Sequence, residues 1–185
     1  MPVTPEEQPR MPWHPQPWTL EDILAMPEDH GQRIELIDGS LHVSPAPDSR
    51  HQRVQRRVDI GLEADLPEHL EILAGVNVVL SSERLLIPDV AVIKTPDVDT
   101  LYYKADDILL VVEVISPSSR SHDKALKRTL YAEAGIRYYL LVDPVPRPAT
   151  AMLFRLDGAD YVEIAVSRAG KLRFGEPFTA DIALA

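Results

Sequence analysis

The chain has 185 residues, of which 45% are hydrophobic and 26% are charged, a composition typical of a soluble globular protein with a sizeable core. It contains no cysteine, which excludes disulfides, thiolate metal sites and cysteine nucleophiles and fits a reducing, cytoplasmic location. Its net charge of -10 argues against indiscriminate binding to phosphate backbones, although local basic patches can act within an acidic protein.

The N-terminus is rich in proline. Residues 1–18 contain six prolines and predict an extended, flexible arm, followed by a single domain over residues 19–185. Trp13 and Trp18 are candidates for pinning the end of the arm to the domain, and docking of a partner is the alternative. The arm lacks the apolar core of a secretory signal, and no apolar run in the chain approaches the ~20 residues of a membrane span.

Three helices and a series of strands are expected after the arm. Thr19 is the expected N-cap of a short helix ending near residue 26, a second helix runs from after residue 48 to about 66, and a third covers residues 121–134 with Gly135 as its stop. Hairpin turns are expected at Asp38-Gly39 and Asp157-Gly158. Strands are expected on both sides of these turns, at 76–81, 85–93, 108–115 and 137–142, and once after residue 170, with an irregular connection at 96–105. The order predicts an α/β (mixed α+β) fold with helices against a mixed sheet.

Two carboxylates interrupt apolar runs that are typical of strands buried on both faces. Asp89 follows Pro88 in the run 85–93, and Glu113 lies in the run 108–115. A carboxylate in such a run needs a charge partner, a metal or a proton. Together with a nearby lysine, the two predict a hard-cation site on a rigid sheet. The alternatives are that Asp89 binds backbone amides at a strand end and that Glu113 forms a buried ion pair with an arginine of a helix.

The nearby lysine is Lys127, which shares one helix face with Asp123 and Tyr131 at a spacing of four residues. One interpretation is a surface pair with Asp123, worth ~0.3–0.5 kcal/mol. The other is that the helix packs its apolar side on the sheet, so that Lys127 reaches over the strand that carries Glu113.

Further candidates lie in the first half of the chain. Glu35 is flanked by apolar residues in the first hairpin and is either on a solvated strand face or a third acid of the site. His51 lies on the apolar stripe of the second helix, as a core or rim residue or as part of the site. The basic residues of the helices form either a solvated face or a patch for phosphate backbones. These residues are Arg50, Arg53, Arg56 and Arg57 on the second helix, and Arg120, Lys124 and Arg128 near Lys127.

Taken in order, these segments resemble the Uma2 family, a large group of bacterial proteins placed among the restriction-endonuclease-like PD-(D/E)XK nucleases. The resemblance covers about residues 19–165. It rests on ELIDG at 35–39, Ser44-Pro45 with His51, Pro88-Asp89, VEVISPS at 112–118, Asp123 with Lys127, Tyr131-Ala132 with AGI at 134–136, and YLLVDP at 139–144.

The resemblance implies a mixed central sheet flanked by helices, with the acids on its central strands. It implies that Asp89 and Glu113 bind Mg²⁺ or Mn²⁺ together with the main-chain carbonyl of Val114. Glu35 would be the acid from the N-terminal region and Lys127 the catalytic lysine, with His51, Asp123 and Tyr131 in support. The superfamily usually places its lysine two residues after the second acid, where this chain has Ile115, so the lysine is expected on the following helix, as Lys127 or alternatively Lys124.

These assignments predict a Mg-dependent endonuclease that hydrolyses DNA and does not bind a membrane. A homodimer is one option, since cutting both strands commonly needs two sites. A catalytically silent module of the same fold that binds nucleic acid or protein is the alternative, because fold membership does not establish cleavage. A hydrolase acting on another phosphoester is a third interpretation.

Overall fold

The structure, a computed structural model, describes residues 16–26, 33–44, 46–116 and 121–185, leaving aside the side chains of 121–124. Its helices are α1 (Leu20–Leu24), α2 (Ser49–Glu63) and α3 (Ser121–Glu133), with a 3-10 turn η1 (Ala105–Asp107). None of the described helices has the length and apolar content needed to cross a membrane.

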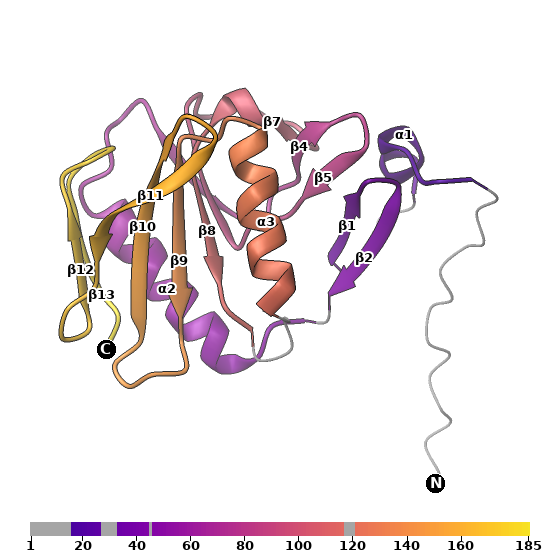
Figure 1. The fold of residues 1–185 in the computed structure, drawn as a ribbon. Coiled ribbons are helices and arrows are strands. Elements are labelled where there is room, and N and C mark those ends of the chain that lie inside the picture. Colours follow the sequence, from indigo (N-terminus) through magenta and orange to yellow (C-terminus); the bar gives the residue numbers. More distant parts are fainter. Residues whose placement is uncertain (1–15, 27–32, 45, 117–120) are drawn as a thin grey trace, which may run out of the picture.

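A six-stranded sheet forms the centre, with α2 against one face and α3 against the other (Figure 1). Its strands, in spatial order, are β11 (Asp160–Val166), β10 (Thr150–Asp157), β9 (Tyr138–Asp143), β8 (Ile108–Val114), β6 (Val90–Ile93) and β3 (Glu71–Ala74). β8 and β9 are parallel and their other neighbours antiparallel, so the sheet is mixed. The expected α/β fold with a mixed sheet flanked by helices is confirmed.

Two smaller sheets complete the fold (Figure 1). The five-stranded sheet has the order β2 (Ser40–Ser44), β1 (Arg33–Ile37), β5 (Arg84–Leu86), β4 (Val78–Ser81) and β7 (Tyr103–Lys104). The two-stranded sheet pairs β12 (Lys171–Phe174) with β13 (Ala180–Ala183).

Strand β8 shows how the sequence covers both faces of the central sheet. Val112 belongs to the same core cluster as Val58 of α2, whereas Val111 belongs to the cluster that includes Tyr131 of α3. Since side chains alternate along a strand, Glu113 points to the same face as Val111. The one acid of an otherwise apolar strand is therefore directed toward α3.

The strand expected over residues 85–93 is instead two strands in different sheets: β5 pairs with β1 and β4, whereas β6 pairs with β3 and β8. The break falls at Pro88, which has no N–H to donate to a ladder. Asp89 follows at the junction, and its backbone N–H donates to Val112 O at 3.0 Å. A bend at this proline thus places the carboxylate where the two sheets meet.

The other predicted elements agree with the structure to different degrees. The first hairpin turns at Asp38-Gly39 as expected, with positive φ at both residues, and α3 is followed by Gly135 at φ 76°. The second hairpin turns one residue later than expected, at 158–159, because Asp157 still pairs with Asp160. Helix α1 has the predicted capping box at Thr19 and ends at Leu24, short of residue 26. The prediction missed the short strands β3 and β7 and gave one strand, not two, for the tail. These strands have at most four residues, so their pairing depends on distant segments more than on a local pattern.

Two close approaches tie the outer elements to the body. Trp18 packs in a cluster with Leu36 and Leu85, and its backbone N–H donates to Gly39 O at 2.9 Å. Helix α2 lies so close to β13 at Gly61 that an added Cβ would come within 2.9 Å of the Ile182 Cα. The remainder of the expected arm, residues 1–15 with Trp13, lies outside the described residues.

Candidate active site

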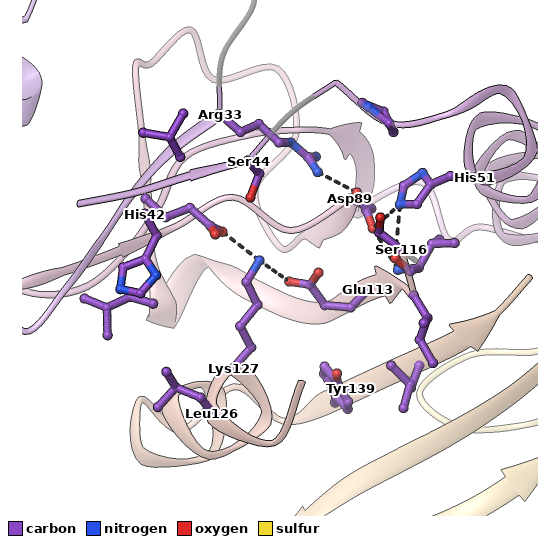
Figure 2. A pocket seen from close by; sticks show the side chains of 17 residues that line it. Arg33, His42, Ser44, His51, Asp89, Glu113, Ser116, Leu126, Lys127 and Tyr139 are labelled. Atoms are coloured by element: carbon purple, nitrogen blue, oxygen red, sulfur yellow. Dashed lines mark hydrogen bonds and ion pairs between the residues drawn. The ribbon is translucent and has the colours of Figure 1, made fainter. Parts of the chain in front are cut away.

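A cavity of about 270 Å³ collects the acidic, basic and imidazole side chains of the predicted site. Each comes from a different element: β1, the N-terminal turn of α2, the junction before β6, β8 and α3. Figure 2 shows Asp89, Glu113 and Lys127 directed into one space. The predicted residues that line the cavity are Glu35, His51, Asp89, Glu113, Val114 and Lys127.

Asp89 is buried and fully engaged. Its Oδ1 accepts from Arg33 Nη1 at 2.6 Å, and its Oδ2 accepts from the Val114 backbone N–H at 2.7 Å. Burial alone would raise the pKa of Asp89, but its contact with His51 and the charge of Arg33 outweigh burial and hold that pKa below its usual value. The carboxylate therefore stays ionised, and the expected bonding to a backbone amide at a strand end is also present.

Lys127 joins two acids across the cavity. Its Nζ donates to Glu35 Oε1 at 2.7 Å and to Glu113 Oε1 at 3.3 Å, and Tyr131 donates its hydroxyl proton to the same Glu113 oxygen at 2.8 Å. Glu35 also accepts from the Ile87 backbone N–H at 2.8 Å. Glu35 is thus buried rather than solvated, and Lys127 reaches over β8 as the second interpretation required.

Different interactions shift the pKa values of Glu113 and Lys127. Burial raises the pKa of Glu113 to about 7 against the opposing charge of Lys127. Burial lowers the pKa of Lys127, but the charges of Glu113 and Glu35 more than offset this and raise it above its ordinary value. The ammonium group therefore stays charged, and the raised pKa makes Glu113 easier to protonate than an ordinary glutamate.

His51 stands where two predicted metal ligands converge. Its Nε2 lies 3.1 Å from Asp89 Oδ2 and 3.0 Å from Val114 O, and its Nδ1 is buried without a hydrogen-bond partner among the described residues. One carboxylate, one main-chain carbonyl and one imidazole thus meet at a point, whereas Glu113 faces Lys127. Across the described parts of the chain, no three His, Cys, Asp or Glu side chains gather around a common metal position.

This donor set fits a divalent cation in its chemistry. Carboxylate and carbonyl oxygens suit Mg²⁺ and Mn²⁺, whereas the His51 Nε2 donates its proton to Asp89 and Val114 O and so offers no lone pair. Arg33 and Lys127 form ion pairs with the two acids that would bind the cation. Binding therefore requires the cation to compete with two side chains of the protein.

Arg33 was not predicted from the sequence, yet it contacts the centre of the site. Besides Asp89, its guanidinium donates to Pro88 O at 3.2 Å. A signal was present, because Arg33 and Glu35 are two residues apart on β1 and so share one face of the strand. Whether this face of β1 points toward Asp89 depends on how the two sheets pack against each other, and a local sequence pattern does not encode that packing.

Several predicted residues lie elsewhere. Arg128 is directed to β10 and β11, where it donates to Tyr161 O at 2.6 Å and lies 4.3 Å above the ring of Phe154. Arg56 is exposed and does not line this cavity. Arg120 and the side chains of Asp123 and Lys124 lie outside the described residues, so their roles stay predictions.

Comparison with known proteins gives the family. A family model described as "Putative restriction endonuclease" matches residues 20–185. The chain belongs to the Uma2 family. No curated protein matches this Uma2 chain.

A crystal structure of a protein described as a "putative nuclease" from Anabaena variabilis matches with a TM-score of 0.67 at 16% identity, over 87% of this chain and 90% of the other. At this identity the likeness shows a shared fold. The family match also reaches beyond residue 165, so it includes β12 and β13.

Proposed function

We propose that this Uma2 chain is a metal-dependent endonuclease that hydrolyses DNA phosphodiester bonds. The observation that carries the proposal is the meeting of Asp89, Glu113 and Lys127 in one cavity, although 38 residues separate the first from the last. The descriptions of the family and of the similar crystal structure both name a nuclease, which supports the same class of reaction. A homodimer and a cytoplasmic location stay predictions.

Asp89, Glu113 and the carbonyl of Val114 are the groups that would hold Mg²⁺ or Mn²⁺, and His51 orients two of them by donating its Nε2 proton to Asp89 and Val114 O. When bound, such a cation lowers the pKa of a water molecule and stabilises negative charge on the phosphate. The cation also resolves a conflict of charge, since clustered acids would otherwise repel a phosphodiester.

The protein's own groups supply the rest of the chemistry. The Lys127 ammonium stays charged and would position the attacking water or neutralise a phosphate oxygen. Glu35 holds this ammonium at 2.7 Å, so we assign Glu35 a positioning role. Tyr131 and Lys127 both bond to Oε1 of Glu113, so we assign the other oxygen, Oε2, to the cation.

The test is cleavage of plasmid, single-stranded DNA, RNA and a chromogenic phosphodiester with Mg²⁺ or Mn²⁺. Asp89→Asn and Glu113→Gln should each lower cleavage of DNA at least about a hundredfold, since each removes charge that acts on the reacting phosphate through the cation. Glu163→Gln, which removes an exposed acid of β11, is the matched control and should cleave like the unaltered chain. Full activity in both site variants, in a preparation free of contaminating nucleases, would show that the assignment is wrong.

A second candidate is the catalytically silent module. The ion pairs of Asp89 with Arg33 and of Glu113 with Lys127 favour it, because they compensate both acids without a cation. Calorimetry separates the two functions. Absence of heat from Mg²⁺ or Mn²⁺ binding, together with DNA binding but no cleavage, would support the module. Cleavage of the chromogenic ester but no nucleic acid would support a different phosphoesterase.

A further inference from the structure

A second cavity, of about 310 Å³, lies beside α2 and is lined by arginines from two parts of the chain. Arg50, Arg53 and Arg57 come from α2, and Arg147 comes from the connection between β9 and β10. The helical spacing of three and four residues brings the first three to one side of the helix. Four guanidinium groups therefore surround one hollow of the surface.

Among the described residues, these four arginines form no ion pair with an acidic side chain, although Asp48 interacts electrostatically with Arg50 and Ala185 also lines the cavity. Other arginines of the chain do form such pairs. The paired ones are Arg33, Arg84, Arg155 and Arg173. Because the chain carries 29 acidic residues against 19 basic ones, a cluster of arginines without such pairs is unexpected by composition. The cavity thus concentrates positive charge on an acidic protein.

Backbone carbonyls hold two of these arginines in place. Arg50 Nη2 donates to Val145 O at 2.8 Å, and Arg57 Nη1 donates to Leu184 O at 3.2 Å. A guanidinium has five N–H donors, so each keeps others for a ligand. The side chains of Arg53 and Arg147 are exposed and have no hydrogen-bond partner among the described residues. Two guanidinium groups held by the backbone and two without such bonds together suit an anion with several acceptor oxygens, such as a phosphate.

The arginine cavity adjoins the candidate active site. His51 lines the first cavity and the preceding residue, Arg50, lines the second; on the sheet side, Leu141 of β9 lines the first and Pro144, just after β9, lines the second. Six residues of helix separate His51 from Arg57, or about 9 Å along the axis. One strand of duplex DNA covers that length in about three nucleotides at ~3.4 Å each.

We propose that the arginine cavity binds a backbone phosphate of a polynucleotide, a few nucleotides from the bond that is cut in the first cavity. The proposal rests on the nuclease function and deepens it. It makes the substrate a chain that extends on the α2 side of the scissile bond, rather than an isolated phosphodiester. Adjacency to a phosphodiester site favours this ligand over an acidic peptide, which would also offer negative charge.

The test measures binding of a fluorescent 20-nucleotide DNA by anisotropy over a range of NaCl concentrations. All proteins carry Glu113→Gln, so that no strand is cut during the measurement. Adding Arg53→Ala or Arg147→Ala should weaken binding about three- to tenfold and reduce the slope of log Kd against log salt by about one, as loss of one phosphate contact does. Arg56→Ala removes an exposed arginine of the same helix outside the cavity and is the matched control, expected to keep the affinity.

The outcomes separate this proposal from the nuclease proposal. Binding in the Arg53 and Arg147 variants that equals binding in the Arg56 variant would overturn the arginine cavity. Polyglutamate that competes as well as DNA, and loses this ability in the same variants, would also overturn it, by making the ligand a carboxylate chain. If the unaltered chain cuts no substrate while the arginine variants still lose DNA binding, the cavity stands and the nuclease proposal fails.

Discussion

Asp89 and Asp59 show how neighbours decide the charge of an aspartate in this fold. Asp89 is the more buried, but its contacts with Arg33, His51 and the Val114 amide keep its pKa low. Asp59 on α2 has a buried oxygen, Oδ1, with no hydrogen-bond partner among the described residues. Burial and the nearby charges of Glu63 and Asp89 raise its pKa from 3.8 to about 6.

The raised pKa predicts a pH-dependent cost at Asp59. The folded state favours the protonated form of Asp59. Asp59 therefore does not destabilise the fold below about pH 4, and it lowers the free energy of unfolding as the pH rises through about 6. Asp59→Asn should therefore raise the free energy of unfolding by about 1–2 kcal/mol at pH 8, allowing for partial exposure, and leave it nearly unchanged at pH 4. Urea unfolding at both pH values measures this. The exposed Asp65→Asn is the control, and an equal effect of Asp59→Asn at both pH values would contradict the prediction.

Helix α2 serves three surfaces at once. Its apolar stripe packs on the central sheet, its N-terminal turn presents His51 to the first cavity, and its arginines line the second. Asp48 caps it by accepting from the backbone N–H groups of Arg50 and His51. The helix axis therefore has to be held in one position for both cavities to keep their shape.

Gly61 is the residue that permits this position against β13. Gly61→Ala adds helix propensity worth up to ~1 kcal/mol, but its Cβ would lie 2.9 Å from backbone and side-chain atoms of Ile182. Overpacking of this kind costs about 1–3 kcal/mol, so we expect a net loss of stability, seen as a lower urea midpoint with an unchanged m value. Gly175→Ala, with no atom within 4 Å of the added Cβ, should not show this loss. A stabilised Gly61→Ala chain would mean that the helix can move away from β13.

Local patterns were enough to predict part of this arrangement. Glu113 stands out because alternation along β8 requires an apolar residue at its position. Lys127 could be predicted because the apolar side of α3 packs on the sheet and so fixes the direction of the helix face that carries Lys127. The break between β5 and β6 was missed, since an apolar run does not show which sheet each half joins. The contact of Arg33 with Asp89 depends on packing between strands far apart in the sequence, and residue spacing does not encode it.

At the scale of the whole molecule, the first cavity lies where the five-stranded sheet meets the central one. Glu35 belongs to the former and Glu113 to the latter, and Lys127 bonds to both. A cation that bound between these elements would stabilise the folded chain as a unit, because the unfolded chain has no such site.

Divalent ions should therefore raise the melting temperature. At a concentration a hundredfold above Kd the gain is about 2.7 kcal/mol, or roughly 5–10 °C for a chain of this size. We expect both Mg²⁺ and Mn²⁺ to produce the shift, since carboxylate and carbonyl oxygens suit either ion, and reversal by EDTA. The prediction is wrong if neither ion shifts the melting temperature of the unaltered chain.

The bond between Glu35 and Lys127 joins residues 92 positions apart. A ribosome releases Glu35 earlier than the lysine by 92 residues, but Glu113 earlier by only 14 residues, since a chain is made from its N-terminus. Until α3 has been synthesised and β9 has paired beside β8, Glu35 and Glu113 lack their compensating ammonium group. Nascent or truncated chains that stop earlier would thus hold an incomplete centre, so any cutting of DNA would begin only after most of the polypeptide had been made.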